Sequence, residues 1–137
     1  MVHTYTLDNG KKVKVTAKNK RVAKKFFNKE HYAYTIVVEA EGTDIAFKTT
    51  YHDSIANYSN GVKCTKDTID NAVYCIILDA DSFRNEPNEN DFLREYGYDE
   101  DEAQGHKVFN ACRDTYKVLY TMLSEEEVDS LYSQVEQ

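Results

Sequence analysis

The acidic run at residues 99–102 is the first segment whose residue types suit a metal ion. Closely spaced carboxylates are the ligands that Ca²⁺ takes in EF-hand loops. This run lacks the glycine at the sixth position and the glutamate at the twelfth that such a loop needs. A loop beginning at Asp79 fails in the same way, because its sixth residue is Arg84 and its twelfth is Asn90. We therefore predict no metal site.

The remaining polar residues show no pattern typical of catalysis. The sequence His52-Asp53-Ser54 contains the residue types of a catalytic triad, but neighbouring residues of an extended chain point in opposite directions. No nucleophile-elbow glycines surround the serine, and no phosphate loop or dinucleotide fingerprint is present. The histidines match no zinc spacing: His3, His31, His52 and His106. We expect a protein that is not an enzyme and needs no cofactor.

The three cysteines have no paired spacing that would indicate a disulfide framework. The first nine residues lack the apolar core of a secretory signal, so we expect a cytoplasmic protein with reduced thiols. The longest apolar run has seven residues, whereas a membrane span needs roughly 20, so no membrane partner is predicted. Cys75 and Cys112 are expected to pack as small hydrophobic residues, and Cys64 to be the most exposed.

Charge is unevenly distributed along the chain. Residues 1–48 hold ten Lys/Arg and five Asp/Glu, whereas residues 49–137 hold seven and nineteen, a balance of −12. Carboxylates spaced along helices can imitate the phosphates of DNA and compete for a basic groove. The candidate partner-binding residues are Glu86, Glu89, Asp91, Glu95, Asp99, Glu100, Asp101 and Glu102, followed by Glu125, Glu126 and Glu127. The alternative is an ordinary solvated face, with residues 99–102 as the charged first turn of a helix.

The basic segment at residues 11–29 holds nine Lys/Arg, with Phe26 and Phe27 among them. Basic residues beside aromatic ones can hold a nucleic-acid strand. The alternative nucleic-acid-binding residues are Lys18, Lys20, Arg21, Lys24, Lys25 and Lys29. The same segment can also be a solvated face, or can bind the acidic helices of a second copy in a homodimer.

Most of the first sixty residues are predicted to form strands, because segments 3–7 and 11–16 alternate apolar and polar side chains and segment 32–38 is dense in β-branched and aromatic residues. Segments 3–7 and 11–16 flank Asp8-Asn9-Gly10, and an Asn-Gly pair between alternating segments is a strong hairpin signal. Segments 32–38 and 44–51 flank a second turn at residues 41–43. At residues 18–30 the apolar side chains have helical spacing, which predicts a short basic helix.

Residues 63–137 are predicted to be mainly helical. Thr65 or Thr68 is expected to cap a helix ending at Ala80, although the apolar run at residues 72–78 equally suits a buried strand. Asn88 is expected to cap a short helix through residue 96.

The longest helix is predicted to begin at Asp99 or Asp101 and to end near Leu123. Gly105 inside it costs about 1 kcal/mol relative to alanine. A capping box at residues 124–127 predicts a last helix. The predicted fold is a single α+β domain over residues 1–137, with a small antiparallel sheet from residues 1–62 packed against three to four helices from residues 63–137.

One segment carries a family resemblance. Residues 91–101 read D-F-L-R-E-Y-G-Y-D-E-D, preceded by D-A-D-S-F at residues 79–83 and followed by V-F-N-A-C at residues 108–112. This arrangement resembles the D-F-x-x-E-[FY]-G-Y-D-x-D stretch of small hypothetical proteins encoded by tailed bacteriophages and prophages. The resemblance covers roughly residues 32–123 and leaves out the basic first thirty residues and the last helix.

The resemblance implies an accessory protein of a phage or mobile element but no particular activity. We expect a protein that binds and inhibits a host defence complex in the host cytoplasm, as anti-CRISPR proteins do, by placing its acidic helical surface in a nucleic-acid channel. One alternative is direct nucleic-acid binding by residues 11–29. Another is a sponge for a small signalling nucleotide, which would need an oligomeric pocket.

Overall fold

The fold is known from a computed structural model that describes residues 1–23, 31–54, 64–84 and 88–136, with only the backbone described at residues 19–23, 31, 53 and 54. Four strands precede four helices: β1 (Val2–Thr6), β2 (Lys12–Ala23), β3 (His31–Ala40), β4 (Ala46–Ser54), α1 (Lys66–Asp81), α2 (Glu89–Glu95), α3 (Ala103–Met122) and α4 (Glu125–Val135). The predicted α+β class, with an antiparallel sheet before the helices, is confirmed.

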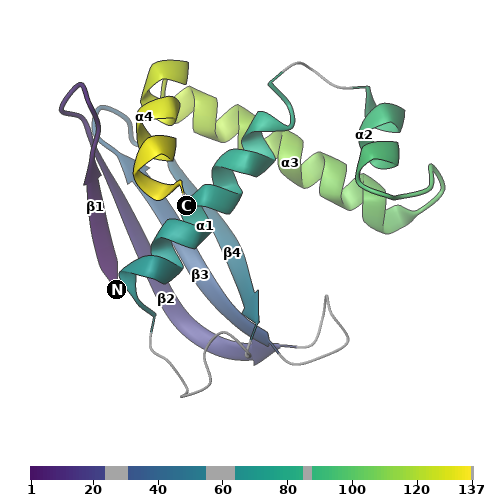
Figure 1. Ribbon diagram of the computed structural model, residues 1–137, viewed down its shortest axis with the longest axis horizontal. Helices are drawn as coiled ribbons and strands as arrows, with labels where there is room; N and C mark the ends of the chain where they lie inside the picture. Colours follow the sequence, from purple (N-terminus) through teal and green to yellow (C-terminus); the bar gives the residue numbers. More distant parts are fainter. Residues whose placement is uncertain (24–30, 55–63, 85–87, 137) are drawn as a thin grey trace.

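The sheet is an antiparallel meander in the order β1-β2-β3-β4. Tyr5 pairs with Val13 across the first hairpin, and Val38 pairs with Phe47 across the last. Because side chains alternate between the two faces of a strand, these residues point to the same face. The helices cover that face (Figure 1), so the alternation seen in the sequence identifies the side of the sheet that enters the core.

The predicted helix at residues 18–30 is wrong where the structure describes it, because residues 18–23 continue β2. Arg21 pairs with Ala33 and Ala23 pairs with His31, after a register shift between Lys18 and Arg21. Pairing with β3 gives the backbone groups of this segment hydrogen-bond partners, and this tertiary effect outweighs the local helical spacing. The rest of the predicted helix, residues 24–30, lies outside the described residues.

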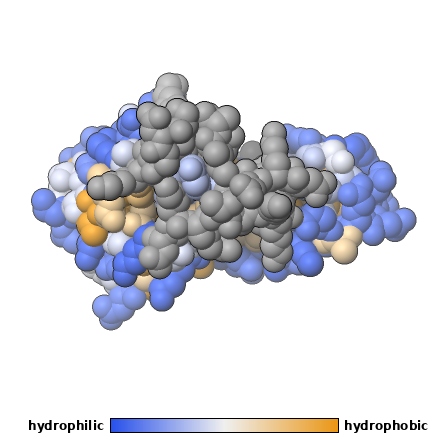
Figure 2. All heavy atoms as spheres, turned by 90° about the horizontal axis from the view of Figure 1, so that it is seen from below, coloured by the Kyte–Doolittle hydropathy of each residue, from blue (hydrophilic) through white to orange (hydrophobic). Residues whose placement is uncertain are grey.

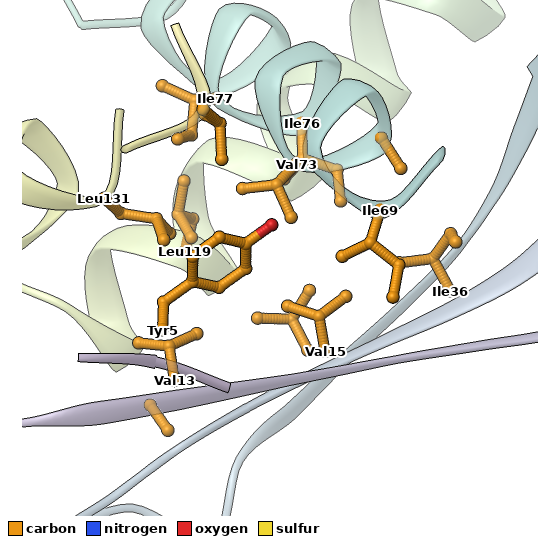
Figure 3. Close-up of a cluster of buried hydrophobic side chains, with 14 of the residues drawn as sticks. Tyr5, Val13, Val15, Ile36, Ile69, Val73, Ile76, Ile77, Leu119 and Leu131 are labelled. Carbon is orange, nitrogen blue, oxygen red and sulfur yellow. The ribbon is translucent and has the colours of Figure 1, made fainter. Parts of the chain in front are cut away.

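The main core lies between the sheet and α1, α3 and α4 (Figure 3). Ile69, Val73 and Ile77 of α1 meet strand residues and the C-terminal part of α3. The apolar run at residues 72–78 is therefore helical. Its outer face stays accessible, since Leu78 is 43% exposed. Cys75 is likewise exposed and Cys64 is half-buried, which reverses the order predicted for these two thiols.

Two predicted caps are present. Thr65 and Ser124 each form a capping box with the residue three positions later, which starts α1 and α4. Glu127 of the second box also accepts hydrogen bonds from Asn9 and Lys11 and so ties the first hairpin to α4. The hydrogen bond from the Ser124 backbone N–H, followed by those from Asn9 and Lys11, lowers the pKa of Glu127 to about 2.

Replacing Glu127 with glutamine is expected to reduce the loss of stability in acid. A carboxyl with a lowered pKa stabilises the fold above its unfolded pKa, and that contribution disappears as the pH falls through the folded value. The unfolding free energy of the unmodified protein should therefore fall more steeply than that of Glu127→Gln between its ordinary pKa of 4.5 and about 2. Urea titrations across this range measure the difference. The exposed Glu126→Gln should follow the unmodified protein, and identical curves for all three would contradict the role of Glu127.

A second, smaller core forms where α3 extends beyond the sheet and carries α2 (Figure 1). Phe83, Phe92, Leu93 and Cys112 are its buried members. The rings of Phe83, Phe92 and Phe109 pack with centroids 4.9–5.4 Å apart. Asn88 caps α2 as predicted, and Gly97 follows it with a φ of 79°, a conformation that glycine adopts without strain. This cluster holds α2 against the protruding half of α3.

In the part of the chain that the structure describes, none of the helices has both the length and the apolar character needed to cross a membrane.

Candidate functional site: the acidic end, the lysine face and the groove

The candidate carboxylates collect at one end of the molecule. α2 and the segment linking it to α3 lie at the end of α3 that is remote from the sheet (Figure 1), and this end is mainly hydrophilic in Figure 2. Between residues 88 and 107 the chain holds seven Asp/Glu and two Lys/Arg. We call these carboxylates the acidic end: Glu89, Asp91, Glu95, Asp99, Glu100, Asp101 and Glu102. Glu86 lies outside the described residues.

Few of these carboxylates are used in internal contacts. Asp91 lies 3.8 Å from Arg94, and both side chains are more than two-thirds exposed, so this ion pair adds little stability. Glu102 accepts a hydrogen bond from the backbone N–H of Asp99. Among the residues described, the carboxylates of Glu95, Glu100 and Asp101 form no ion pair, so their charges face solvent.

The start predicted for the longest helix, at Asp99 or Asp101, is wrong. α3 begins at Ala103, with Glu102 as its N-cap residue in an extended conformation. Residues 99–102 instead form a turn closed by the bond from Glu102 N–H to the Asp99 carbonyl, 3.1 Å long. The first turn of α3 contains no acidic residue, so the charged-first-turn interpretation of residues 99–102 is also wrong.

His106 joins the three parts of the acidic end. Its Nδ1 bonds to the Glu89 carboxylate on α2, and its Nε2 lies 2.6 Å from the Glu100 carbonyl in the connecting turn. Both partners are acceptors when Glu89 is ionised, so forming both bonds requires an imidazolium with two N–H groups. The bond to Glu89 and then the bond to Glu100 raise the pKa of His106 above 6.5.

The titration of His106 is expected to have its midpoint above the ordinary value and to move back toward it in the Glu89→Gln variant. A histidine with a raised pKa contributes stability that is complete below its unfolded pKa and is lost as the pH rises through the folded one. Proton NMR of the imidazole ring across pH 5 to 9 measures the midpoint. The variant Glu95→Gln is the matched control, because Glu95 is not among the hydrogen-bond partners of His106. An equal shift in both variants would contradict the contact.

The carboxylates of α4 do not extend the acidic end. Glu127 is held by Lys11, and Arg84 lies 3.9 Å from Glu125 and 3.5 Å from Asp129. These residues belong to the part of the fold that covers the sheet, and cations neutralise part of their charge. The predicted acidic surface is thus concentrated in α2 and the turn before α3.

The predicted basic segment is only partly described. Lys18 is exposed, Lys20 and Arg21 are described only as backbone of β2, and Lys24, Lys25 and Lys29 lie outside the described residues. Lys12 and Lys14 alternate with the buried Val13 and Val15, so they share with Lys18 the face opposite the helices.

Lys48 joins this face from β4. Thr16 of β2 pairs with Val37 of β3, which in turn pairs with Lys48 of β4. Lys48 therefore lies on the same face as Lys14, two residues further along the register and with β3 between them. We call Lys12, Lys14, Lys18 and Lys48 the lysine face. All four are exposed. The basic-segment prediction missed Lys48. Its position next to the apolar Phe47 in a strand indicates that Lys48 points to the opposite, solvent-facing side of the sheet.

A groove of about 390 Å³ opens beside the acidic end, between the ends of α1 and α2 and the first half of α3. Its lining consists of Asp79, Tyr96, Gln104, Lys107, Val108, Ala111 and Cys112. Partial burial raises the pKa of Asp79 to about 6. Burial and the nearby Asp79 charge raise the pKa of the Cys112 thiol to about 11. A thiol that stays protonated is a poor nucleophile, so Cys112 is not activated for nucleophilic attack.

The structure therefore brings together the carboxylates of residues 89–102, places part of the basic segment on the lysine face, and adds a groove that the sequence does not indicate. Among the residues described, no group of three or more His, Cys, Asp or Glu is arranged to hold a metal ion. Compared with known proteins, the chain matches no protein-family model, no curated protein and no solved structure at a significant level. What it binds is inferred from the chemistry of its own surfaces.

Proposed function

We propose that this protein acts by binding, without catalysis, and that its acidic end occupies the basic nucleic-acid channel of a partner protein. The observation that carries the proposal is the set of seven carboxylates on one protruding end, six of them on exposed residues. The aromatic cluster around Phe92 and the His106 contacts hold these charges in a defined arrangement. A rigid arrangement loses little entropy on binding and can match an equally rigid row of cations.

The class of partner follows from charge and from the phage resemblance. A channel that binds nucleic acid is lined with Lys and Arg, and it attracts an acidic end over long distances at low salt. The segment that resembles phage proteins includes Asp91, Glu95, Asp99 and Asp101. We therefore propose a host defence effector as the partner and inhibition of the anti-CRISPR kind as the outcome, in the host cytoplasm.

Affinity capture from a bacterial host lysate, followed by mass spectrometry, is the first test. The expected result is a nuclease or other nucleic-acid-binding protein that salt releases. The triple variant Glu95→Gln, Asp99→Asn, Asp101→Asn should lose this protein. The matched control is Glu41→Gln, Glu126→Gln, Glu136→Gln, which removes the same charge from exposed residues elsewhere. Equal capture by both triple variants, or capture of no such protein, would overturn the proposal.

The lysine face supports a second candidate, direct binding to a nucleic-acid backbone. Four exposed lysines and neighbouring threonine hydroxyls share one side of the sheet, with Glu39 as an acidic neighbour. Each phosphate neutralised by a lysine makes binding more dependent on salt. A gel shift at about 50 mM salt should show binding that Lys14→Gln, Lys48→Gln removes and Lys107→Gln, Lys117→Gln on α3 retains. No shift at this salt concentration would exclude the candidate.

A further inference from the structure

The groove and the acidic end are continuous. Tyr96, which lines the groove, directly follows Glu95, and Gln104 and Lys107 of the lining follow Glu102 on α3. The groove therefore adjoins the acidic end, and a basic surface that docks there can reach it. This continuity ties the ligand of the groove to the partner proposed above.

The lining of the groove combines apolar side chains with a carboxylate. Val108, Ala111 and Cys112 of α3 are its apolar members, and Asp79 near the end of α1 supplies the carboxylate. Among the residues described, the Asp79 carboxylate forms no hydrogen bond or ion pair, although the α1 backbone around it is bonded. Asp79 is an exposed residue, so its carboxylate is accessible, and a carboxylate with no counter-ion is stabilised by an arriving cation. A ligand with a positive charge on an apolar stem suits both the carboxylate and the apolar lining.

Tyr96 adds an aromatic surface. Its side chain is 45% exposed, and its ring stacks on Phe92 with centroids 4.4 Å apart. The buried Phe92 thus fixes one face of the ring and leaves the rest accessible. A guanidinium stacks on such a ring and makes paired hydrogen bonds to a carboxylate, whereas an ammonium is a compact, strongly hydrated point charge. The aromatic ring therefore favours arginine over lysine.

We infer that the groove receives an arginine side chain of the basic partner, with its guanidinium between the Asp79 carboxylate and the Tyr96 ring and its methylenes against Val108 and Ala111. This inference rests on the proposed function. The volume of 390 Å³ lies at the small end of ligand sites, as expected for one long side chain with water. Arginines that fill a pocket at the centre of an interface commonly account for much of its affinity.

The other ionisable groups facing the groove are Lys107, Tyr96 and Cys112. Burial raises the pKa of both Tyr96 and Cys112, so both are neutral at pH 7. Lys107 is the one cation lining the groove among the residues described, and its positive charge opposes a guanidinium. Replacing Lys107 with glutamine should therefore tighten arginine binding, a change opposite in sign to that of Asp79→Asn.

Calorimetric titration of the full chain with capped tri-arginine and tri-lysine peptides tests the inference. Asp79→Asn should weaken tri-arginine binding about 10-fold and tri-lysine binding by a clearly smaller factor, because both peptides lose a charge attraction but only arginine loses a charge-assisted paired hydrogen bond. The triple variant Glu95→Gln, Asp99→Asn, Asp101→Asn should weaken both peptides. Amide signals of residues 108–112 should shift with tri-arginine, and unchanged circular dichroism of Asp79→Asn confirms that the variant folds.

The outcomes separate the two proposals. If Asp79→Asn leaves tri-arginine affinity unchanged while the triple variant lowers it, the groove inference is overturned and the proposed function stands. If Asp79→Asn weakens both peptides equally, selection of arginine is overturned. If the triple variant changes neither affinity, the acidic end is not the binding surface and the proposed function fails.

Discussion

Replacing Leu119 with alanine is expected to lower the free energy of unfolding by about 2–5 kcal/mol, the largest effect of any substitution considered. Leu119 is 1% exposed and belongs to the main core, close to Tyr5 and Leu131 (Figure 3). Shortening it removes apolar contacts and leaves a cavity between the sheet and two helices, which the surrounding backbone cannot fill without breaking other contacts. Urea unfolding followed by far-ultraviolet circular dichroism measures the loss.

The matched control is Leu78→Ala. Leu78 is also a helical leucine, but it is 43% exposed. Truncating it creates no buried cavity and should lower the free energy of unfolding by less than about 1 kcal/mol. Equal losses in the two variants would show that the main core between sheet and helices is not the main source of stability.

Replacing Gly105 with alanine is expected to destabilise the protein by about 1–2 kcal/mol, although helix propensity alone predicts a gain of about 1 kcal/mol. A Cβ atom at this position would lie 2.8 Å from Leu93 Cδ2 and 2.8 Å from Tyr98 Cβ. Overpacking of this kind costs about 1–3 kcal/mol. The clash wins because Tyr98 Cβ is attached directly to a backbone held by the 2.8 Å bond from Tyr98 N–H to the Leu93 carbonyl.

The loss in Gly105→Ala should be concentrated in α2 and the acidic turn. Hydrogen exchange of the α2 amides should accelerate, while the exchange of β2 and β3 stays unchanged. Asn110→Ala, on the exposed side of α3, is the matched control and should raise stability by about 0.5 kcal/mol. In a double variant with Leu93→Ala, the combined loss should be smaller than the sum, because one of the clashing atoms is removed. Stabilisation by Gly105→Ala would contradict the close packing of α2 on α3.

Helix caps, turns and strands that depend only on neighbouring residues could be predicted from the sequence. The Asn-Gly turn, the caps at Thr65, Asn88 and Ser124 and the β-branched and aromatic composition of β3 each depend on residues within a few positions of one another. A cap requires only a side-chain oxygen next to free backbone N–H groups, so its position can be located without knowing what the helix packs on. The α+β class followed from the same signals.

Predictions failed where a distant segment decides the local structure. The backbone at residues 18–23 is extended because β3 offers hydrogen bonds. The residue types within the segment do not indicate that it pairs with β3. Cys75 is exposed because the apolar run in α1 covers more of the helix than the sheet can bury. Gly105 was interpreted as a weak point of a helix, but the close approach of Leu93 and Tyr98 makes it a packing requirement.

The candidate sites show the same difference between features formed by sequence neighbours and features formed by distant segments. The acidic end was visible in the sequence because its carboxylates are near neighbours along the chain, and a short helix and a turn keep them together. The lysine face depends on strand register, which places Lys48 on the same face of the sheet as Lys14, although 33 residues separate them in the sequence. The groove depends on packing between α1, α2 and α3, which brings Asp79 and Tyr96 to the same groove as Cys112. Charge and turn chemistry are properties of neighbouring residues, whereas a pocket exists only after distant helices have packed.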